Sequence, residues 1–132
     1  MTIYHSIAGL ARKGELFLIA KRKPGGALGN KWEFPGGKVE PGETHGEAII
    51  REWDEEFRVA VDPGDFICSG QFTHKGKDFL LSAYEIKLIS EEFQMLEHTE
   101  IRWEAMSTIE KMDVADSDRA LFPLIKEFFG LT

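Results

Sequence analysis

The sequence predicts a single α/β (α+β) domain, residues 1–132, in which a mixed β-sheet is sandwiched between helices. Three observations predict this class. Apolar-rich runs of strand length precede one amphipathic helix, a second set of such runs follows it, and a helical pattern closes the chain. A chain of 132 residues is long enough to bury a core without disulfides or a structural metal.

Composition and charge exclude several classes of function. Hydrophobic content of 42% and charged content of 30% are ordinary for a soluble globular protein. The net charge of −7 disfavours nonspecific binding to nucleic acid polymers or to anionic membranes. Neither a signal peptide nor a run of roughly 18 apolar residues is present, so we expect a cytoplasmic protein. The only cysteine, Cys68, lies in an apolar run and is expected to be buried.

The first predicted strands are residues 4–11 and 15–21, and Arg12-Lys13-Gly14 between them indicates a hairpin. Residues 23–31 contain three glycines and no periodicity, which is typical of a flexible loop. The loop then leads into the stretch 33–59, around which the rest of the chain is organised.

The first half of this stretch has the residues of tight turns, and a helix follows. In Pro35-Gly36-Gly37 and Pro41-Gly42, proline fixes its φ angle and glycine permits a positive φ. Thr44 and Glu47 have the spacing of a capping box, in which each side chain bonds the other residue's backbone N–H. A helix is therefore predicted to begin near Thr44.

This helix is expected to have an apolar face and an acidic face. At about 100° per residue the apolar face gathers Ile49, Ile50, Trp53 and Phe57, and the acidic face gathers Glu52, Glu55 and Glu56. Like charges at spacings of three and four residues repel. Mg²⁺ is commonly held by a few carboxylates together with substrate phosphates, so the acidic face indicates a Mg²⁺–phosphate site.

Residues 62–65 are predicted to form a turn, and residues 66–73 and 78–88 a second hairpin around a tip at 74–77. Residues 90–100 are expected to be an acidic loop, and residues 101–103 a short strand. Ser107 is a candidate cap for a short helix that runs through Met112. The last helix is predicted from Asp118 on, with a stop at Gly130; its start stays open because Pro123 comes early in the pattern.

The stretch 33–59 resembles the signature of the Nudix hydrolases. The matching positions are Gly37, Glu43, Arg51, Glu52, Trp53, Glu55, Glu56 and Val59. Arg58 stands where the signature has a glycine before Val59, so the helix is expected to end differently. Trp53 is larger than the aliphatic residue that is usual at its position. The resemblance implies a Nudix fold over nearly the whole chain and a relation to the MutT nucleotide-pool enzymes.

The resemblance implies a metal site. In MutT-like relatives the metal is held by a loop glycine carbonyl, by the signature glutamates, and by a later glutamate six residues before a tryptophan. Here these positions are Gly36, Glu52, Glu55, Glu56 and Glu97, with Trp103 as the tryptophan. The ion is expected to be Mg²⁺, with Mn²⁺ able to substitute.

Hydrolysis at a phosphorus atom needs a base that takes a proton from the attacking water. Glu52 is the first candidate and Glu97 the second. Arg51 is expected to orient Glu52 or to pair with Glu47, and Glu43 to tie the loop to the helix.

The resemblance also implies a base pocket. Asp118 matches the position at which triphosphate-hydrolysing relatives place a polar residue against the base. A plain helix cap is an equal alternative, and the two roles are compatible. An ionised Asp only accepts hydrogen bonds, which favours cytosine or an oxidised guanine. Arg22, Phe34 and His74 are further candidates for substrate contacts.

The predicted function is the Mg²⁺-dependent hydrolysis of a nucleoside triphosphate, with cytidine or oxidised guanine nucleotides favoured, to a nucleoside monophosphate and pyrophosphate. One alternative is a Nudix hydrolase of ADP-ribose or nucleotide sugars. The other is a nucleotide-binding Nudix module without catalysis. The partner is expected to be a small nucleotide, and the protein a monomer or a homodimer.

Overall fold

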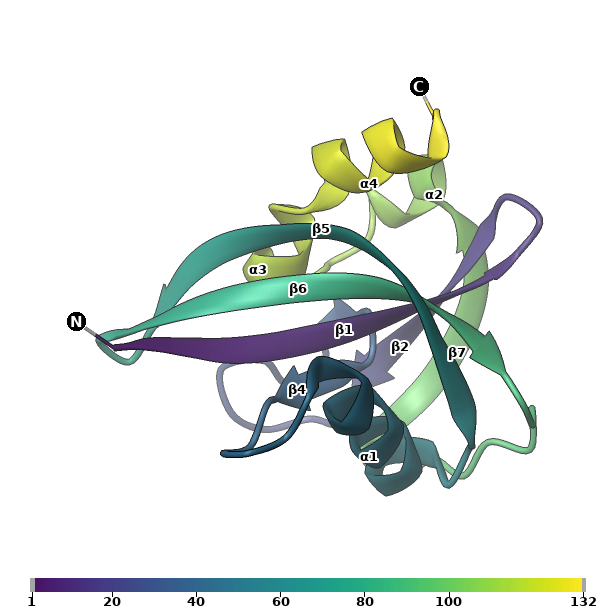
Figure 1. Cartoon of the computed structure of the whole chain (residues 1–132). Helices are drawn as coiled ribbons and strands as arrows, with labels where there is room; N and C mark the ends of the chain where they lie inside the picture. Colours follow the sequence, from purple (N-terminus) through teal and green to yellow (C-terminus); the bar gives the residue numbers. More distant parts are fainter. Residues whose placement is uncertain (1, 132) are drawn as a thin grey trace.

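The computed structural model describes residues 2–131 and shows seven strands and four helices in that range (Figure 1). The strands are β1 Ile3–Lys13, β2 Leu16–Arg22, β3 Trp32–Glu33, β4 Gly36–Lys38, β5 Val61–His74, β6 Lys77–Leu88 and β7 His98–Ala105. The helices are α1 His45–Phe57, α2 Met106–Ile109, α3 Asp116–Arg119 and α4 Phe122–Phe129. No helix within 2–131 is both long and apolar enough to cross a membrane.

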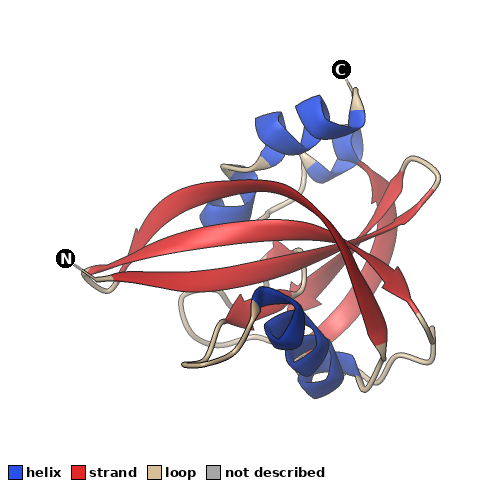
Figure 2. Ribbon diagram, in the orientation of Figure 1, coloured by secondary structure: helices blue, strands red, loops and turns tan. Residues whose placement is uncertain are grey.

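The strands form a mixed sheet with helices on both sides, as predicted. The strand order is β3-β2-β1-β6-β5, with β1 and β6 parallel and the other neighbouring pairs antiparallel. Figure 2 shows α1 on one side of the strands and the three C-terminal helices on the other. The sheet therefore needs an apolar surface on both faces.

Alternation along the strands supplies both surfaces. In β1, Ile7 packs in the core that contains α1, whereas Ala8 and Leu10 pack in the core that contains α4. Leu18 and Ile19 of β2 divide between the same two cores. This is the period of two that places successive strand side chains on opposite faces. Cys68 is buried in the core on the α4 side, as expected.

The predicted hairpin of β1 and β2 is confirmed, but its strands separate early. Only Arg12 with Phe17 and Lys13 with Leu16 form pairs. β1 then pairs with β4 and β6, whereas β2 pairs with β3 and β7. Pairing with β1 places β4 beside the middle of α1, where Gly37 lies against Glu52.

Helix α1 begins as predicted. Thr44 is its N-cap, and both hydrogen bonds of the capping box with Glu47 are present. Trp53 is fully buried, and a Cβ on Gly9 would lie 2.6 Å from its indole Nε1. The large signature residue is therefore accommodated by a glycine on β1. The prediction for Ile50 is wrong: it is 46% exposed, and Ala48 is buried in its place.

Arg58 ends the helix in the way that a glycine would. It adopts the left-handed conformation, with φ 56° and ψ 39°, and its N–H donates to the carbonyl of Asp54. The expectation of a different helix end is therefore wrong. A residue with a Cβ has the same backbone geometry there, at a cost of about 1 kcal/mol.

Two predictions beyond α1 need correction. Residues 62–65 are not a free turn but belong to β5, where the pairing register with β6 shifts between Pro63 and Phe66. The hairpin of β5 and β6 is present, and its tip is tighter than predicted: Lys75 and Gly76 have positive φ. The turn residues at 62–65 accommodate an irregularity inside a long strand.

The C-terminal third also differs in detail from the prediction. β7 begins three residues earlier than expected, at His98. Helix α2 has Ala105 as N-cap and no side-chain cap, so Ser107 is not the cap. The predicted closing helix is two helices, α3 and α4, with Pro123 in the first turn of α4 and Gly130 at its left-handed end. Proline is tolerated there because the first N–H groups of a helix lack partners within it.

Candidate active site

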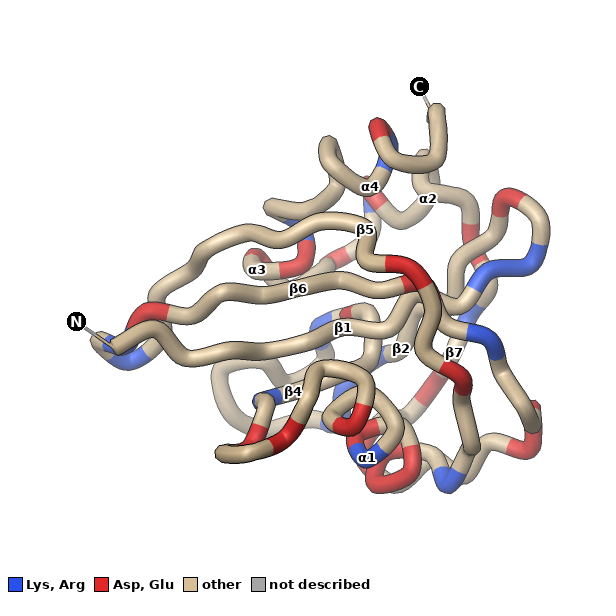
Figure 3. Tube along the Cα trace, viewed as in Figure 1, with Lys and Arg blue, Asp and Glu red and all other residues tan. Residues whose placement is uncertain are grey.

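The predicted metal-site residues lie around one cavity. The cavity has a volume of about 290 Å³ and is lined by Arg22, Gly36, Gly37, Glu52, Glu55, Glu56 and Glu97. β4 supplies the glycines, α1 supplies three carboxylates, and the loop before β7 supplies the fourth. The acidic segments of α1 are visible in Figure 3. We call this the acidic cavity.

Gly37 is in close contact with Glu52. A Cβ on Gly37 would lie 2.6 Å from the carboxyl carbon of Glu52, which is closer than real Cβ atoms approach. The absence of a side chain at position 37 therefore lets the Glu52 carboxylate lie against β4. This contact is a physical reason for glycine at that signature position.

Arg51 is the centre of the charge network behind the cavity. Its Nε donates to Glu43 over 2.7 Å, and its Nη1 donates to Glu52 over 2.8 Å. The bond from Arg51 lowers the pKa of Glu43 to about 2. Arg51 also donates to the carbonyl of Lys38. Arg51 therefore contacts Glu52, and Glu43 ties the loop to the helix, as expected.

The alternative pairing of Arg51 with Glu47 is wrong. Glu47 uses its carboxylate in the capping box, where it accepts from the N–H of Thr44 over 2.9 Å. Arg51 instead reaches Glu55, one turn further along, over 3.3 Å.

Glu52 and Glu56 are held in surroundings that disfavour their charge. Burial is the largest cause that raises the pKa of Glu52, and its bond to Arg51 opposes that shift. Burial also raises the pKa of Glu56 well above its usual range, with Glu33 and Glu52 as additional like charges. A carboxylate in such surroundings takes up a proton or a cation.

The donor set fits a hard divalent cation. Oε2 of Glu56 is buried and has no hydrogen-bond partner among residues 2–131. The same cavity presents the other carboxylates and the backbone of Gly36. Oxygen ligands of this kind are the ones that Mg²⁺ and Mn²⁺ take in proteins. The residues present therefore fit the expected metal.

Sequence reasoning missed two residues beside this cavity, Glu33 and His98. Together with Glu56 they form a buried group whose side-chain oxygen and nitrogen atoms lie within 4.8 Å of one another. Each lies next to a residue that the pattern did identify, Glu33 before Phe34 and His98 after Glu97. For Glu33, which stands between Trp32 and Phe34, a charged residue among apolar ones was the available signal, whereas His98 lies between Glu97 and Thr99 and has no such signal.

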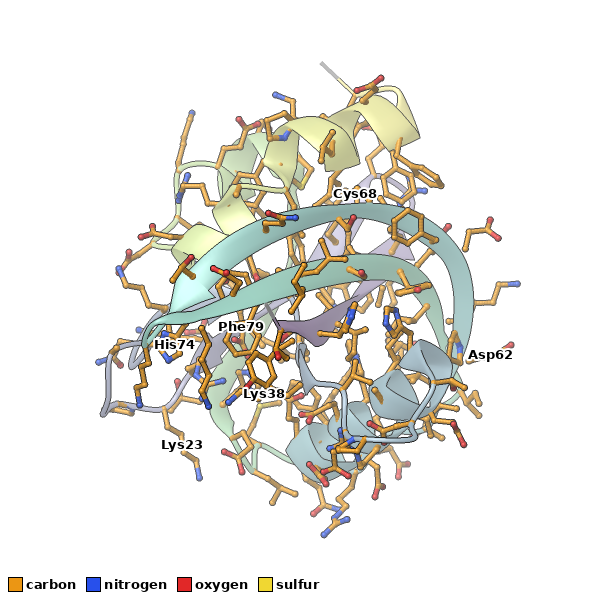
Figure 4. All side chains as sticks on the ribbon, turned by 60° about the vertical axis from the view of Figure 1, so that its left-hand side comes forward. Lys23, Lys38, Asp62, Cys68, His74 and Phe79 are labelled. Carbon is orange, nitrogen blue, oxygen red and sulfur yellow. The ribbon has the colours of Figure 1, made fainter. Side chains whose placement is uncertain are left out.

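A second, larger cavity adjoins the first. It has a volume of about 530 Å³ and shares Arg22, Gly36 and Gly37 with the acidic cavity. The four predicted base-pocket residues, Arg22, Phe34, His74 and Asp118, all line it. Its aromatic wall includes Phe72 and Phe79, whose rings stack 5.0 Å apart. In Figure 4, His74, Phe79 and Lys38 lie toward the same end of the sheet. We call this the base cavity.

Asp118 is held in place by the backbone that precedes the glycines. Its Oδ2 accepts the N–H of Phe34 over 2.8 Å. Asp118 lies inside α3, whose N-cap is Ala115, and the N-cap of α4 is Leu121, so Asp118 is not a helix cap. Burial, with Glu33 as the next cause, raises the pKa of Asp118 to about 8. We expected an ionised Asp118. Burial instead favours the protonated form, which can donate as well as accept a hydrogen bond.

Comparison with known proteins agrees with this architecture. The NUDIX domain model matches residues 6–125, so the chain belongs to the Nudix family. The resemblance that the signature indicated is thereby confirmed, and the relatives below confirm its MutT-like type.

Three relatives are informative. The CTP pyrophosphohydrolase of Escherichia coli (strain K12) is 28% identical over 131 residues, which covers 99% of this chain and 95% of that protein. The putative 8-oxo-dGTP diphosphatase 2 of Mycobacterium tuberculosis is 31% identical over 116 residues, or 86% and 81% of the two chains. The crystal structure of the MutT protein from Methanosarcina mazei Go1 aligns with a TM-score of 0.82 at 26% identity, covering 95% and 94%.

Proposed function

We propose that this protein is a Mg²⁺-dependent pyrophosphohydrolase that converts a nucleoside triphosphate to a nucleoside monophosphate and pyrophosphate. The observation that carries the proposal is the adjacency of the two cavities. One is lined by four carboxylates and the other by aromatic side chains and Asp118, and both share Arg22, Gly36 and Gly37. A nucleotide has the same division into a polyphosphate and a base.

We assign the cation to the acidic cavity, where Glu52, Glu55, Glu56, Glu97 and the carbonyl of Gly36 would hold it. When bound, the cation neutralises charge on the phosphate oxygens and on the leaving group. The cation also reduces the electrostatic repulsion between a protein of net charge −7 and a negatively charged nucleotide. Arg22 is a cationic side chain at the junction of the cavities, so we assign it to the phosphate chain.

The base in the reaction is assigned to Glu52. Its burial raises its pKa, which brings it nearer to the working pH, while the bond from Arg51 favours its ionised form. Glu52 takes a proton from water as the water oxygen bonds to a phosphorus of the chain, and the P–O bond that joins the nucleoside monophosphate to the pyrophosphate breaks. Glu97 is exposed at the cavity rim and remains the second candidate.

The base preference is assigned to Asp118. A protonated carboxyl offers one O–H donor and one acceptor, which complements the adjacent acceptor N3 and amino donor of cytosine. The neighbouring O6 and N1–H of an oxidised guanine offer the same pair. The names of the two curated relatives support these two substrate classes.

A substrate screen tests the proposal. Canonical and oxidised nucleoside triphosphates, ADP-ribose, nucleotide sugars and dinucleoside polyphosphates are incubated with Mg²⁺, and pyrophosphate and phosphate are both quantified. We expect pyrophosphate with the monophosphate, and highest kcat/KM for a cytidine or an oxidised guanine nucleotide. ADP-ribose as the best substrate would establish the rival hydrolase. Nucleotide binding without turnover of any compound would establish the binding module.

A further inference from the structure

A buried cluster of three polar side chains lies between the two cavities. Glu33 lines the base cavity, Glu56 lines the acidic cavity, and His98 lies between their carboxylates. Nε2 of His98 is 2.8 Å from Oε2 of Glu33 and 3.6 Å from Oε1 of Glu56. The His98 side chain is 0% exposed, so water does not separate it from these partners.

The His98 ring is fixed from two directions. It stacks on Phe57, the last residue of α1, with ring centroids 5.0 Å apart and planes at 16°. Its backbone is paired with Arg22 at the start of β7. The guanidinium of Arg22 lies 3.4 Å from the same oxygen of Glu33 that contacts His98. Oε2 of Glu33 therefore contacts both the His98 ring and the Arg22 guanidinium.

The proton on Nε2 follows from its partner. A carboxylate oxygen accepts a hydrogen bond, so we assign the proton to Nε2, which donates to Glu33 over 2.8 Å. Oε1 of Glu56 lies 3.6 Å from the same nitrogen, which is a polar contact and not a hydrogen bond. Without this N–H the carboxylates of Glu33 and Glu56 would face each other across a dry gap and repel. With it, one oxygen of Glu56 faces His98 and the other, Oε2, is left without a partner among the described residues.

We propose that His98 is a positioning residue for the divalent cation: it orients the Glu56 carboxylate so that Oε2 is presented to the ion. The inference rests on the proposed function, because it requires a cation in the acidic cavity. His98 acts through Glu56 and does not itself bind the ion. Partners of metal ligands typically change metal affinity by about 10- to 100-fold when they are mutated.

The test measures Mn²⁺ binding to the free protein by electron paramagnetic resonance, with no nucleotide present. His98→Phe keeps the stacking on Phe57 and removes the donor, and we expect its dissociation constant to rise about 10- to 100-fold. His98→Gln keeps an N–H donor at a similar reach, and we expect a value within a few-fold of wild type. His5→Phe, on the exposed start of β1, is the matched control and should leave binding unchanged.

The outcomes separate the two proposals. If wild-type protein binds no Mn²⁺ at millimolar levels, the proposed function fails. If wild type binds Mn²⁺ and His98→Phe binds it equally well, only the role of His98 fails. Should His98→Phe not fold, tenfold weaker binding by a folded His98→Gln would overturn the inference. An imidazole nitrogen coupled to bound Mn²⁺ in electron spin echo spectra would also overturn it, because His98 would then be a ligand.

Discussion

Substitution of Asp118 by Asn should change how the stability of the protein depends on pH. The carboxyl is buried, and its pKa is raised from 3.8 to about 8. Folding therefore favours the protonated form. The stability that this group contributes is fully present below the unfolded pKa of 3.8 and is lost as pH rises through the folded pKa of about 8. Asn is neutral throughout, and its carbonyl can still accept the N–H of Phe34.

The size of the effect follows from the pKa difference. One pKa unit corresponds to about 1.4 kcal/mol. Between about pH 5 and pH 8 the free energy of unfolding of the wild type should fall by about 4 kcal/mol relative to that of Asp118→Asn. This is most of the pH-dependent stability that the Asp118 carboxyl contributes. The neighbouring charge of Glu33 contributes to this value and is unchanged in the variant.

The assay is urea unfolding of wild type and variant at intervals of one pH unit over this range. The difference between their unfolding free energies should shift steadily in favour of the variant as pH rises. Asp116→Asn is the matched control on the same helix, and because its side chain is exposed it should follow the wild-type curve. A constant difference between wild type and Asp118→Asn across the range would refute the raised pKa.

Three further predictions concern the proposed base Glu52, its contact with Gly37, and the end of α1. Glu52→Gln should lower kcat by about 100- to 10,000-fold while the protein still folds, and wild-type turnover would remove Glu52 from the mechanism. Gly37→Ala should displace the Glu52 carboxylate and lower kcat while the protein still folds; unaltered kinetics would show that the close contact is unimportant. Arg58→Gly should stabilise the protein by about 0.5 kcal/mol, since relief of about 1 kcal/mol of backbone strain exceeds the loss of the exposed pair with Asp54. Arg58→Ala keeps the strain, so thermal unfolding that ranks it above Arg58→Gly would contradict that account.

Local rules in the sequence predicted the parts of the fold that depend on neighbouring residues. The capping box of Thr44 and the acidic face of α1 follow from spacing alone. Ile50 shows the limit of such rules, because periodicity places it within the apolar arc but only packing decides where that arc ends. The turn predicted at residues 62–65 was wrong for a similar reason, because turn-forming residues also occur where the pairing register shifts within a strand.

The residues of the candidate site that match the spacing of the family signature were predicted from the sequence. Glu33 and His98 were missed because they are 65 residues apart and meet only when β2 pairs with both β3 and β7. The protonation of Asp118 was also out of reach, because it depends on burial. Contacts between distant segments and desolvation are properties of the folded chain, not of a local pattern.

The central claim is that the carboxylates of the acidic cavity bind a divalent cation that hydrolysis requires. Its most direct test is a titration of Mn²⁺ into wild type and Glu56→Gln, with pyrophosphate release measured in parallel after chelation and after Mg²⁺ is restored. We expect wild type to bind the ion, Glu56→Gln to bind it far more weakly, and turnover to stop with the chelator and return with Mg²⁺. Equal binding by the two proteins, or hydrolysis that continues in excess chelator, would contradict the account.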